Sequence, residues 1–384
     1  MSRLSNHEGR RGMNQKYKKV YCCSPRCLRA GIENFWHRDM GLISQTLLSM
    51  GVESKCVLPL PYHDVDWHDY LIRTEYSNLE SAEWWKSLQI DALVLYSWGA
   101  PCYRRVASAV RKAGIFLHIH MDTSGDFLGA DYAGKPWYLR LWTQFRVKTQ
   151  DLFRSWHLRQ ADILTMGPDA AEKISRKLFY GKWVRERCVP MPCPVSPLCR
   201  YDGEMKENII LCIGRWDDIF QKRPELLMDT LSCYYAGGGS AETRIFGTIT
   251  DELRSWHAQL PAETAEKVKL MGFLQNSLLW QEYKKSRVIL CPSRFESSHI
   301  VSAEALCCGC SVVTPPLHES LCDVIWYTTR ESGTIAAEDS AGAMADALHQ
   351  EIAHWEAGRR NPVSIAEAWQ PHFHADKVLN KIFE

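Results

Sequence analysis

Short apolar runs alternate with segments of helical period along this chain of 384 residues, and the alternation occurs twice. In the first half we predict strands over residues 20–23, 53–58, 92–96, 115–119, 163–166 and 188–190, with helices between them. In the second half we predict strands over residues 209–213, 244–246, 268–271, 288–291 and 311–313. Alternation of this kind is typical of parallel sheets that carry helices on both faces. The sequence therefore predicts an α/β fold with two Rossmann-like sheets.

A proline-rich segment separates the two halves. Residues 190–197 contain four prolines in eight positions, and neither a helix nor a strand continues through such a run. We interpret this segment as an interdomain linker. The predicted domains are residues 17–196 and 197–362, preceded by a polar tail over residues 1–16 that we expect to be mobile. Residues 363–384 are predicted as a C-terminal helix.

The charge balance and the cysteines limit the classes of protein. There are 46 basic and 45 acidic residues, for a net charge of +1, so no bulk attraction to nucleic acid is expected. The fifteen cysteines lie in hydrophobic strands and helices rather than at framework spacings. We therefore expect reduced thiols in a cytoplasmic protein. No signal peptide is visible, and no run approaches the ~20 apolar residues of a membrane span.

Two carboxylates eight positions apart, Glu296 and Glu304, follow the predicted strand 288–291 and span the start of a helix. The free backbone N–H groups of a first helical turn can hold phosphate, and Ser298, His299, Ile300 and Val301 occupy that position. Glu296 precedes the helix, while Glu304 lies on the order of 12 Å further along if the intervening residues are helical. One carboxylate can thus reach a sugar and the other a ribose. This geometry favours a nucleotide-sugar site.

A second motif lies upstream, after the predicted strand over residues 209–213. Gly214 and Arg215 end this strand, and Lys222 stands just before a helix that opens at Pro224. Cations at such a position can neutralise a diphosphate leaving group as a glycosidic bond breaks. The alternative is an arginine that caps a strand and a lysine in a solvated turn.

Together, the Glu-x7-Glu element, the Gly309 to Val313 segment that follows it and the Gly-Arg…Lys element resemble the signature of the retaining GT-B glycosyltransferases, family 4 type. The resemblance implies the GT-B fold, in which two Rossmann-like domains face each other across a cleft. In that architecture the C-terminal helix often crosses back to the first domain, and residues 363–384 are a candidate for this role. The seven-residue spacing between Arg215 and Lys222 exceeds the usual spacing of the family by one or two.

The resemblance also implies roles for single residues. Arg215 and Lys222 would hold the donor diphosphate, Glu296 would contact the donor sugar and Glu304 the ribose. His120, at the end of the predicted strand 115–119, would contact the sugar hydroxyls from the first domain. The alternative for His120 is a loop histidine whose neighbours satisfy it.

Other positions match the family less fully. Asp122 is the second candidate, after His120, for the contact with the donor sugar. Gly272, Phe273 and Leu274 match the segment whose main-chain groups read the nucleobase, although a simple strand-to-helix turn is the alternative. Where the family has a glycine-rich turn before its first helix, only Gly41 is available here.

A basic and aromatic stretch over residues 135–159 allows two interpretations. It carries six basic residues against one acidic residue, interleaved with aromatic side chains. Such a stripe can lie on an anionic bilayer, but an ordinary helix packs its aromatic face on the sheet. We favour core packing, with Trp142, Phe145 and Phe153 inside the first domain, so peripheral membrane contact is not the favoured interpretation.

We predict a retaining glycosyltransferase that moves a sugar from a nucleotide diphosphate sugar donor to a hydroxyl-bearing acceptor. The resemblance implies no cofactor and no metal, and residues 63–69, although rich in metal-ligand types, are interpreted as a solvated loop. The alternatives are another GT-B activity, such as a nucleotide-sugar epimerase or a phosphorylase, and a catalytically silent protein that binds a sugar nucleotide.

Overall fold

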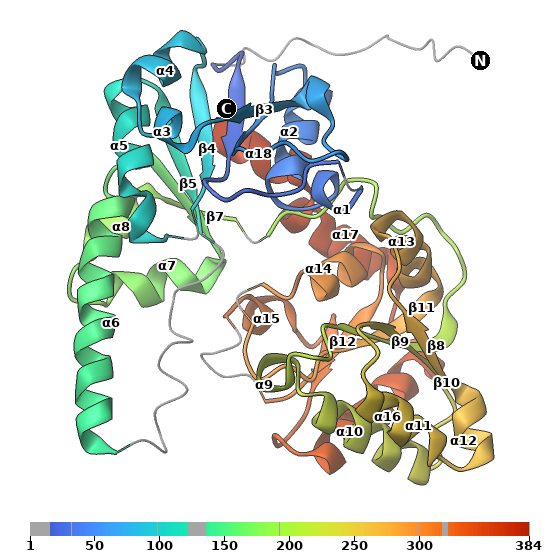
Figure 1. Ribbon diagram of the computed structural model, residues 1–384. Helices are drawn as coiled ribbons and strands as arrows, with labels where there is room; N and C mark the ends of the chain where they lie inside the picture. The colour runs from blue at the N-terminus through green and yellow to red at the C-terminus, as the bar shows by residue number, and fades with distance from the viewer. Residues whose placement is uncertain are drawn as a thin grey trace, which may run out of the picture.

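The computed structural model describes residues 16–31, 33–97, 99–121, 136–191, 193–296, 298–316 and 322–383. They form two α/β domains, each built on one parallel sheet (Figure 1). The predicted class, α/β with two Rossmann-like sheets, is confirmed. The predicted tail, apart from Lys16, lies outside the described residues.

The first sheet has seven strands in the order β3-β2-β1-β4-β5-β6-β7. Their bounds are β1 (Val20–Cys23), β2 (Cys56–Pro59), β3 (Leu71–Thr74), β4 (Ala92–Tyr96), β5 (Phe116–His120), β6 (Ile163–Met166) and β7 (Cys188–Pro190). Every residue of β1, β2 and β4 is buried, as expected for strands covered by helices on both faces. The sequence prediction missed β3, which is only four residues long.

Helices cover both faces of the first sheet (Figure 1). They are α1 (Glu33–Trp36), α2 (Asp39–Ser49), α3 (Tyr76–Leu79), α4 (Ala82–Ser87), α5 (Arg104–Lys112), α6 (Trp137–Leu158), α7 (Pro168–Ser175) and α8 (Lys182–Arg187), with short 3-10 turns η1 (His68–Tyr70) and η2 (Pro101–Tyr103). Between β1 and β2, where the sequence predicts a helix, the chain forms two helices, and Asp39, the first residue of α2, takes a left-handed backbone conformation with φ of 50°.

The second sheet has six strands in the order β10-β9-β8-β11-β12-β13. Their bounds are β8 (Glu207–Gly214), β9 (Glu242–Gly247), β10 (Val268–Gly272), β11 (Ser286–Leu290), β12 (Ser311–Thr314) and β13 (Gly333–Ile335). The chain leaves β8 toward one edge of the sheet and returns at β11 on the other side, so β8 and β11 meet at the topological switch point. Ligands of open α/β sheets bind beyond the carboxyl ends of the strands at such a point.

The remaining helices belong to the second half of the chain. They are α9 (Ile219–Lys222), α10 (Pro224–Ala236), α11 (Asp251–Ala258), α12 (Ala262–Lys267), α13 (Asn276–Lys285), α14 (Ile300–Cys307), α15 (Cys322–Tyr327), α16 (Ala341–Glu356), α17 (Pro362–Phe373) and α18 (Ala375–Phe383). The last helix packs against α2 of the first domain and adds Val378, Leu379 and Phe383 to its core.

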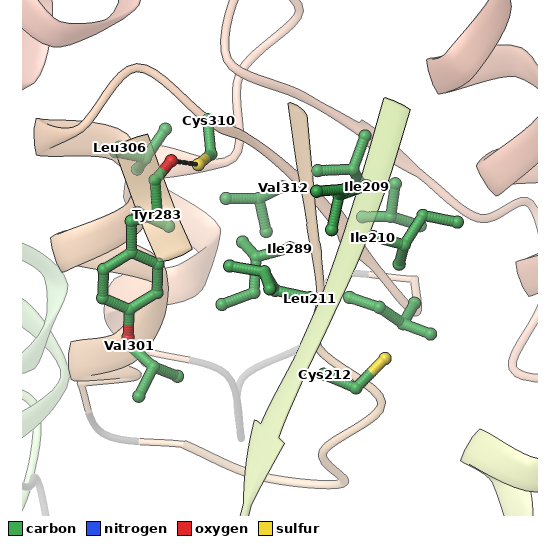
Figure 2. Packing of buried hydrophobic residues seen from close by; sticks show 14 of the residues in the cluster. Ile209, Ile210, Leu211, Cys212, Tyr283, Ile289, Val301, Leu306, Cys310 and Val312 are labelled. Carbon is green, nitrogen blue, oxygen red and sulfur yellow. Dashed lines mark hydrogen bonds between the residues drawn. The ribbon is translucent and has the colours of Figure 1, made fainter. Parts of the chain in front are cut away.

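Buried aliphatic side chains of the central strands hold the second domain together. Figure 2 shows Leu211 and Ile289 side by side on the neighbouring strands β8 and β11, with Tyr283, Val301 and Leu306 to one side of them. Each such side chain contributes about 1.5–3 kcal/mol when it is fully removed from water. The Tyr283 ring lies in the same layer and points toward Val301 (Figure 2), which places its hydroxyl at the side of α14.

Helix α6 contradicts the predicted core packing of residues 135–159. It extends away from the first domain (Figure 1), and Trp142, Phe145 and Phe153 are 62%, 65% and 43% exposed. Among the helix residues whose burial is described, the buried ones lie at the C-terminal end, where Leu158 is fully buried and the chain contacts α5 and η2. The interpretation of these aromatic residues as core residues is therefore wrong. Lys135 lies outside the described residues.

Candidate active site

A cavity of about 470 Å³ lies beyond the carboxyl ends of β8 and β11. Most of its lining comes from the second domain, and Asn34 and Arg38 reach it from the first. The predicted residues that line it are Arg215, Lys222, Phe273, Leu274, Glu296, Ser298, His299, Ile300 and Val301. The structure thus brings the two sequence motifs together at the switch point of the second sheet.

A larger cavity of about 770 Å³ lies between the loop after α15 and helix α17. None of the predicted residues lines it. The guanidinium group of Arg360, which lines this larger cavity, is already paired with the Glu351 carboxylate at 2.6 Å. The chemistry of the two motifs therefore points to the smaller cavity.

The carboxylate of Glu296 forms the centre of the candidate site. Its side chain is only 6% exposed and forms an ion pair with Lys222. Gln221 donates from Nε2 to Oε2 of Glu296 at 3.3 Å, and Nε2 of His299 lies 3.9 Å from Oε1. A charged carboxylate in such a place needs these partners, because burial without them would be costly.

The local fold explains how Lys222 reaches Glu296. The residues between Arg215 and Lys222 include the single helical turn α9, and Asp218 caps this turn by accepting from the backbone N–H of Gln221 at 3.1 Å. Arg223 then takes a left-handed conformation with φ of 54°, which separates α9 from α10. The long spacing noted in the sequence thus corresponds to a helical turn that directs Lys222 into the cavity.

Arg215 lies at the open side of the cavity. Its side chain is 68% exposed and makes contacts of 3.3 Å with Asp218 and with Oε1 of Gln221. Both contacts are at the surface, where an ion pair is worth little. The guanidinium group is therefore accessible to an anion that enters from solvent.

His299 lines the cavity with an uncharged imidazole. The residue is 3% exposed, and burial, together with the nearby charges of Lys222 and Arg38, lowers the pKa of its imidazole well below the ordinary value. Its Nδ1 lies 2.6 Å from the Ser302 hydroxyl. The imidazole therefore adds hydrogen-bonding capacity at neutral pH without adding charge.

Glu304 is buried beside the cavity and does not line it. Its Oε2 accepts hydrogen bonds from Nη2 of Arg38 and from the Tyr283 hydroxyl, both at 3.0 Å. Burial lowers the pKa of Arg38, but the charge and hydrogen bond of Glu304, together with Tyr283 and Asp39, more than offset this and the net pKa is raised. The arginine comes from the first domain, so this ion pair joins the two domains across the cleft.

Sequence reasoning missed Arg38, Asn34, Gln221 and Tyr283. Arg38 stands immediately before α2, where the resembled family has its glycine-rich turn. A cation at the place of an expected phosphate-binding turn is a signal that could have identified Arg38. The other three residues carry no such signal, since their positions depend on contacts with residues far away in the chain.

Several predicted residues lie away from the cavity. His120 is 2% exposed, and its Nδ1 lies 2.9 Å from the Thr165 hydroxyl. Burial lowers the pKa of this imidazole to about 4, and its buried Nε2 makes no hydrogen bond with the described residues. Asp122, the second candidate for this contact, lies outside the described residues.

The two predicted glycines have structural roles. Gly41 lies in the first turn of α2, and a Cβ there would come within 2.1 Å of the Phe35 carbonyl oxygen. Gly272 ends β10 with φ of 75°, a conformation that glycine adopts at little cost. Gly272 thereby turns the chain so that Phe273 and Leu274 reach the cavity.

These groups suit the binding of a polar anion. Arg215, Lys222 and Arg38 supply cations, and the first turn of α14 supplies N–H groups that lack partners within the helix. In the described parts of the chain, no three metal-ligating side chains gather in a group that could hold a metal ion. Asp66, from the loop interpreted as solvated, is instead buried and paired with Arg73 at 3.0 Å.

Comparisons with known proteins agree with this site. Residues 207–354 match the family model of the glycosyl transferases group 1, and this range contains Arg215, Lys222, Glu296 and Glu304. None of the curated protein sequences compared with the chain matches it.

Solved structures resemble the whole chain. Sucrose-phosphate synthase from Thermosynechococcus elongatus has 14% identity and a TM-score of 0.62, over 95% of this chain and 97% of that chain. HepE from Anabaena in complex with UDP has 12% identity and a TM-score of 0.67, over 95% and 98%. The glycosyltransferase from Rickettsia africae has 11% identity and a TM-score of 0.65, over 96% and 97%.

The two sheets and the shared cavity define a protein of the GT-B fold, as the resemblance implied. The family match over the second domain, taken with this fold, supports a glycosyltransferase.

Proposed function

We propose that this protein is a retaining glycosyltransferase of the family 4 type, which transfers a sugar from a nucleotide diphosphate sugar to an acceptor hydroxyl. One observation carries the proposal. Arg215, Lys222 and the first turn of α14 surround the cavity that also holds Glu296, and all of them lie in the range that matches the glycosyl transferases group 1.

The diphosphate of the donor binds between the two cations and the start of α14. Lys222 has three N–H donors, so it can keep its ion pair with Glu296 and still donate to a phosphate oxygen. Arg215 is exposed and closes on the diphosphate from the open side. The backbone N–H groups of Ile300 and Val301 complete the site at the helix N-terminus.

We assign the ribose to Glu304 as the resemblance implies. Because this carboxylate is buried beside the cavity rather than in its lining, the assignment requires Arg38, which does line the cavity, to move aside when the donor binds. Arg38 and Tyr283 both donate to Oε2 of this carboxylate, so we assign Oε1 to a ribose hydroxyl. Leu274 and the exposed Phe273 line the same cavity, and we assign the nucleobase to this segment. The contact between His120 and the donor sugar stays a prediction.

The reaction breaks the bond between the anomeric carbon and the phosphate oxygen, and forms a bond between that carbon and the acceptor oxygen on the same face of the sugar. The electron pair of the broken bond goes to the departing phosphate, whose oxygen takes the acceptor proton. The protein stabilises the growing negative charge and positions the two substrates. No metal is required by this assignment, since cationic side chains carry the charge.

A thermal-shift screen against UDP, GDP, ADP and their sugars tests the proposal. UDP belongs in the screen because HepE, one of the similar structures, was solved with UDP and with UDP-glucose. A ligand at 100 times its dissociation constant should add roughly 2.7 kcal/mol to the free energy of unfolding. An absence of stabilisation by every nucleotide and every sugar nucleotide would contradict the proposed donor site.

A further inference from the structure

The apolar face of α6 points toward solvent, whereas an amphipathic helix of a globular protein usually turns its apolar face toward the core. At 3.6 residues per turn, Tyr138, Leu141, Trp142, Phe145 and Trp156 fall within a sector of about 100°. These side chains are 56%, 56%, 62%, 65% and 45% exposed, respectively. We call these five residues the α6 stripe. A surface helix normally turns such a stripe toward the core, so this one is built to contact something else.

Basic side chains border the stripe on both sides. Lys148 lies next to Leu141 on the helix surface, and Arg146 lies next to Trp142; both are exposed. At the C-terminal end of α6, the guanidinium group of Arg104 lies 5.8 Å from the centre of the Trp156 ring. The stripe therefore has a cationic margin along its length.

The acidic residue of α6 is turned away from the stripe. Asp151 lies 3.7 Å from Arg154 and 3.9 Å from Lys177, and it accepts a hydrogen bond from the Tyr180 hydroxyl at 3.2 Å. Its charge is thus balanced on the side that faces the first domain. The outward surface keeps its positive character.

The combination of aromatic and basic residues identifies the partner. A second copy of the chain that packed stripe against stripe would bring the two cationic margins together, which is unfavourable. An anionic bilayer complements the margins, and tryptophan and tyrosine prefer the boundary between headgroups and acyl chains. None of the helices in the described ranges is both long and apolar enough to cross a bilayer.

We propose that the α6 stripe docks the protein on an anionic lipid bilayer, with α6 lying in the plane of the membrane surface. The aromatic side chains enter the headgroup region, while Arg146 and Lys148 contact lipid phosphates. The proposal does not depend on the glycosyltransferase assignment, because no residue of the stripe lines the candidate active site.

Sedimentation of the full chain with vesicles tests the proposal. Binding to phosphatidylcholine vesicles that contain phosphatidylglycerol should exceed binding to phosphatidylcholine alone, and it should fall as salt shortens the Debye length from about 10 Å at 0.1 M to about 3 Å at 1 M. The variant with Arg146→Ser and Lys148→Ser should bind roughly fivefold more weakly for each residue replaced. A variant with Arg176→Ser and Arg185→Ser is the matched control, since it removes two exposed cations of the same domain outside α6.

A second pair of variants tests the apolar part. Trp142→Ser with Phe145→Ser should abolish sedimentation with anionic vesicles and leave the thermal unfolding midpoint unchanged, while Leu178→Ser, at an exposed leucine outside α6, should bind like the wild type. The proposal is overturned if the wild type does not bind anionic vesicles, or if the variants of α6 bind as the wild type does. It is also overturned if light scattering shows a dimer that the Trp142 and Phe145 replacements dissociate. Should the aromatic variant fail to fold, the variant of Arg146 and Lys148 decides alone.

Discussion

Lys222→Ala should reduce both stability and activity, for two separable reasons. The Lys222 and Glu296 side chains are only 12% and 6% exposed, so the replacement leaves a carboxylate nearly buried without its charged partner. Loss of one partner from a buried pair costs about 3–5 kcal/mol. The remaining exposure of Lys222 and the contact from Gln221 at 3.3 Å favour the lower end, about 3 kcal/mol. For a domain of roughly 150–250 residues this lowers the unfolding midpoint by about 6–12 °C.

The double variant Lys222→Ala with Glu296→Gln separates the two effects. Neutralising the carboxylate removes the uncompensated charge, so calorimetry should show that much of the lost stability returns. Because Glu296→Gln by itself lowers turnover, the reference for activity is that single variant. The double variant should turn over more slowly than Glu296→Gln, because the diphosphate still lacks a cation. A double variant that turns over as fast as Glu296→Gln alone would falsify the diphosphate role and reduce Lys222 to a partner of Glu296.

Arg215→Ala is the matched control for stability. This side chain is 68% exposed and pairs only at the surface, so the free energy of unfolding should stay within about 0.5 kcal/mol of the wild type. The value of kcat/KM should nevertheless fall by roughly 100-fold, the scale for losing one transition-state donor. Unchanged stability in Lys222→Ala, as in Arg215→Ala, would refute the reasoning from burial.

Three further results are expected. In calorimetry with the bare nucleoside diphosphate, Glu304→Gln should weaken binding, while Glu296→Gln should preserve binding and lower turnover; equal losses of affinity would contradict the division of roles. Proton NMR of the first-formed product should show an α linkage from an α-linked donor, and a β linkage would remove the protein from the retaining class. The hydrogen bonds from Arg73 and two backbone N–H groups overcome the effect of burial and lower the pKa of Asp66 from 3.8 to about 2. Because the folded-state pKa lies below the ordinary one, this stabilisation is present above about pH 4 and is lost as the pH falls toward 2. Urea unfolding of the wild type should therefore show a loss of about 2 kcal/mol across this window that Asp66→Asn lacks; parallel curves would reject the assignment.

The sequence by itself determined the alternation of elements and the location of the candidate site. Strands buried on both faces are short apolar runs, so they are visible in local composition. The loop after β11 contains Pro292 and Ser293, and α14 begins at Ile300, within the segment from which the sequence predicted the start of a helix. The two strands that were missed, β3 and β13, contain four and three residues. Length alone does not explain the misses, since β1 also has four residues but is a continuous apolar run. Arg73 interrupts the apolar pattern of β3, and Gly333 and Thr334 leave β13 with one apolar residue.

Tertiary structure alone decided which side chains meet. Arg38 and Glu304 are 266 positions apart and form their ion pair only because the two domains close on each other. The burial of His120, which keeps it out of the cavity, likewise depends on its packing against β6. The α6 stripe shows the same limit most clearly. Its period specifies an amphipathic helix, but period alone does not state which way the apolar face points, and only the position of α5 and η2 at one end of the helix leaves Trp142 and Phe145 in solvent.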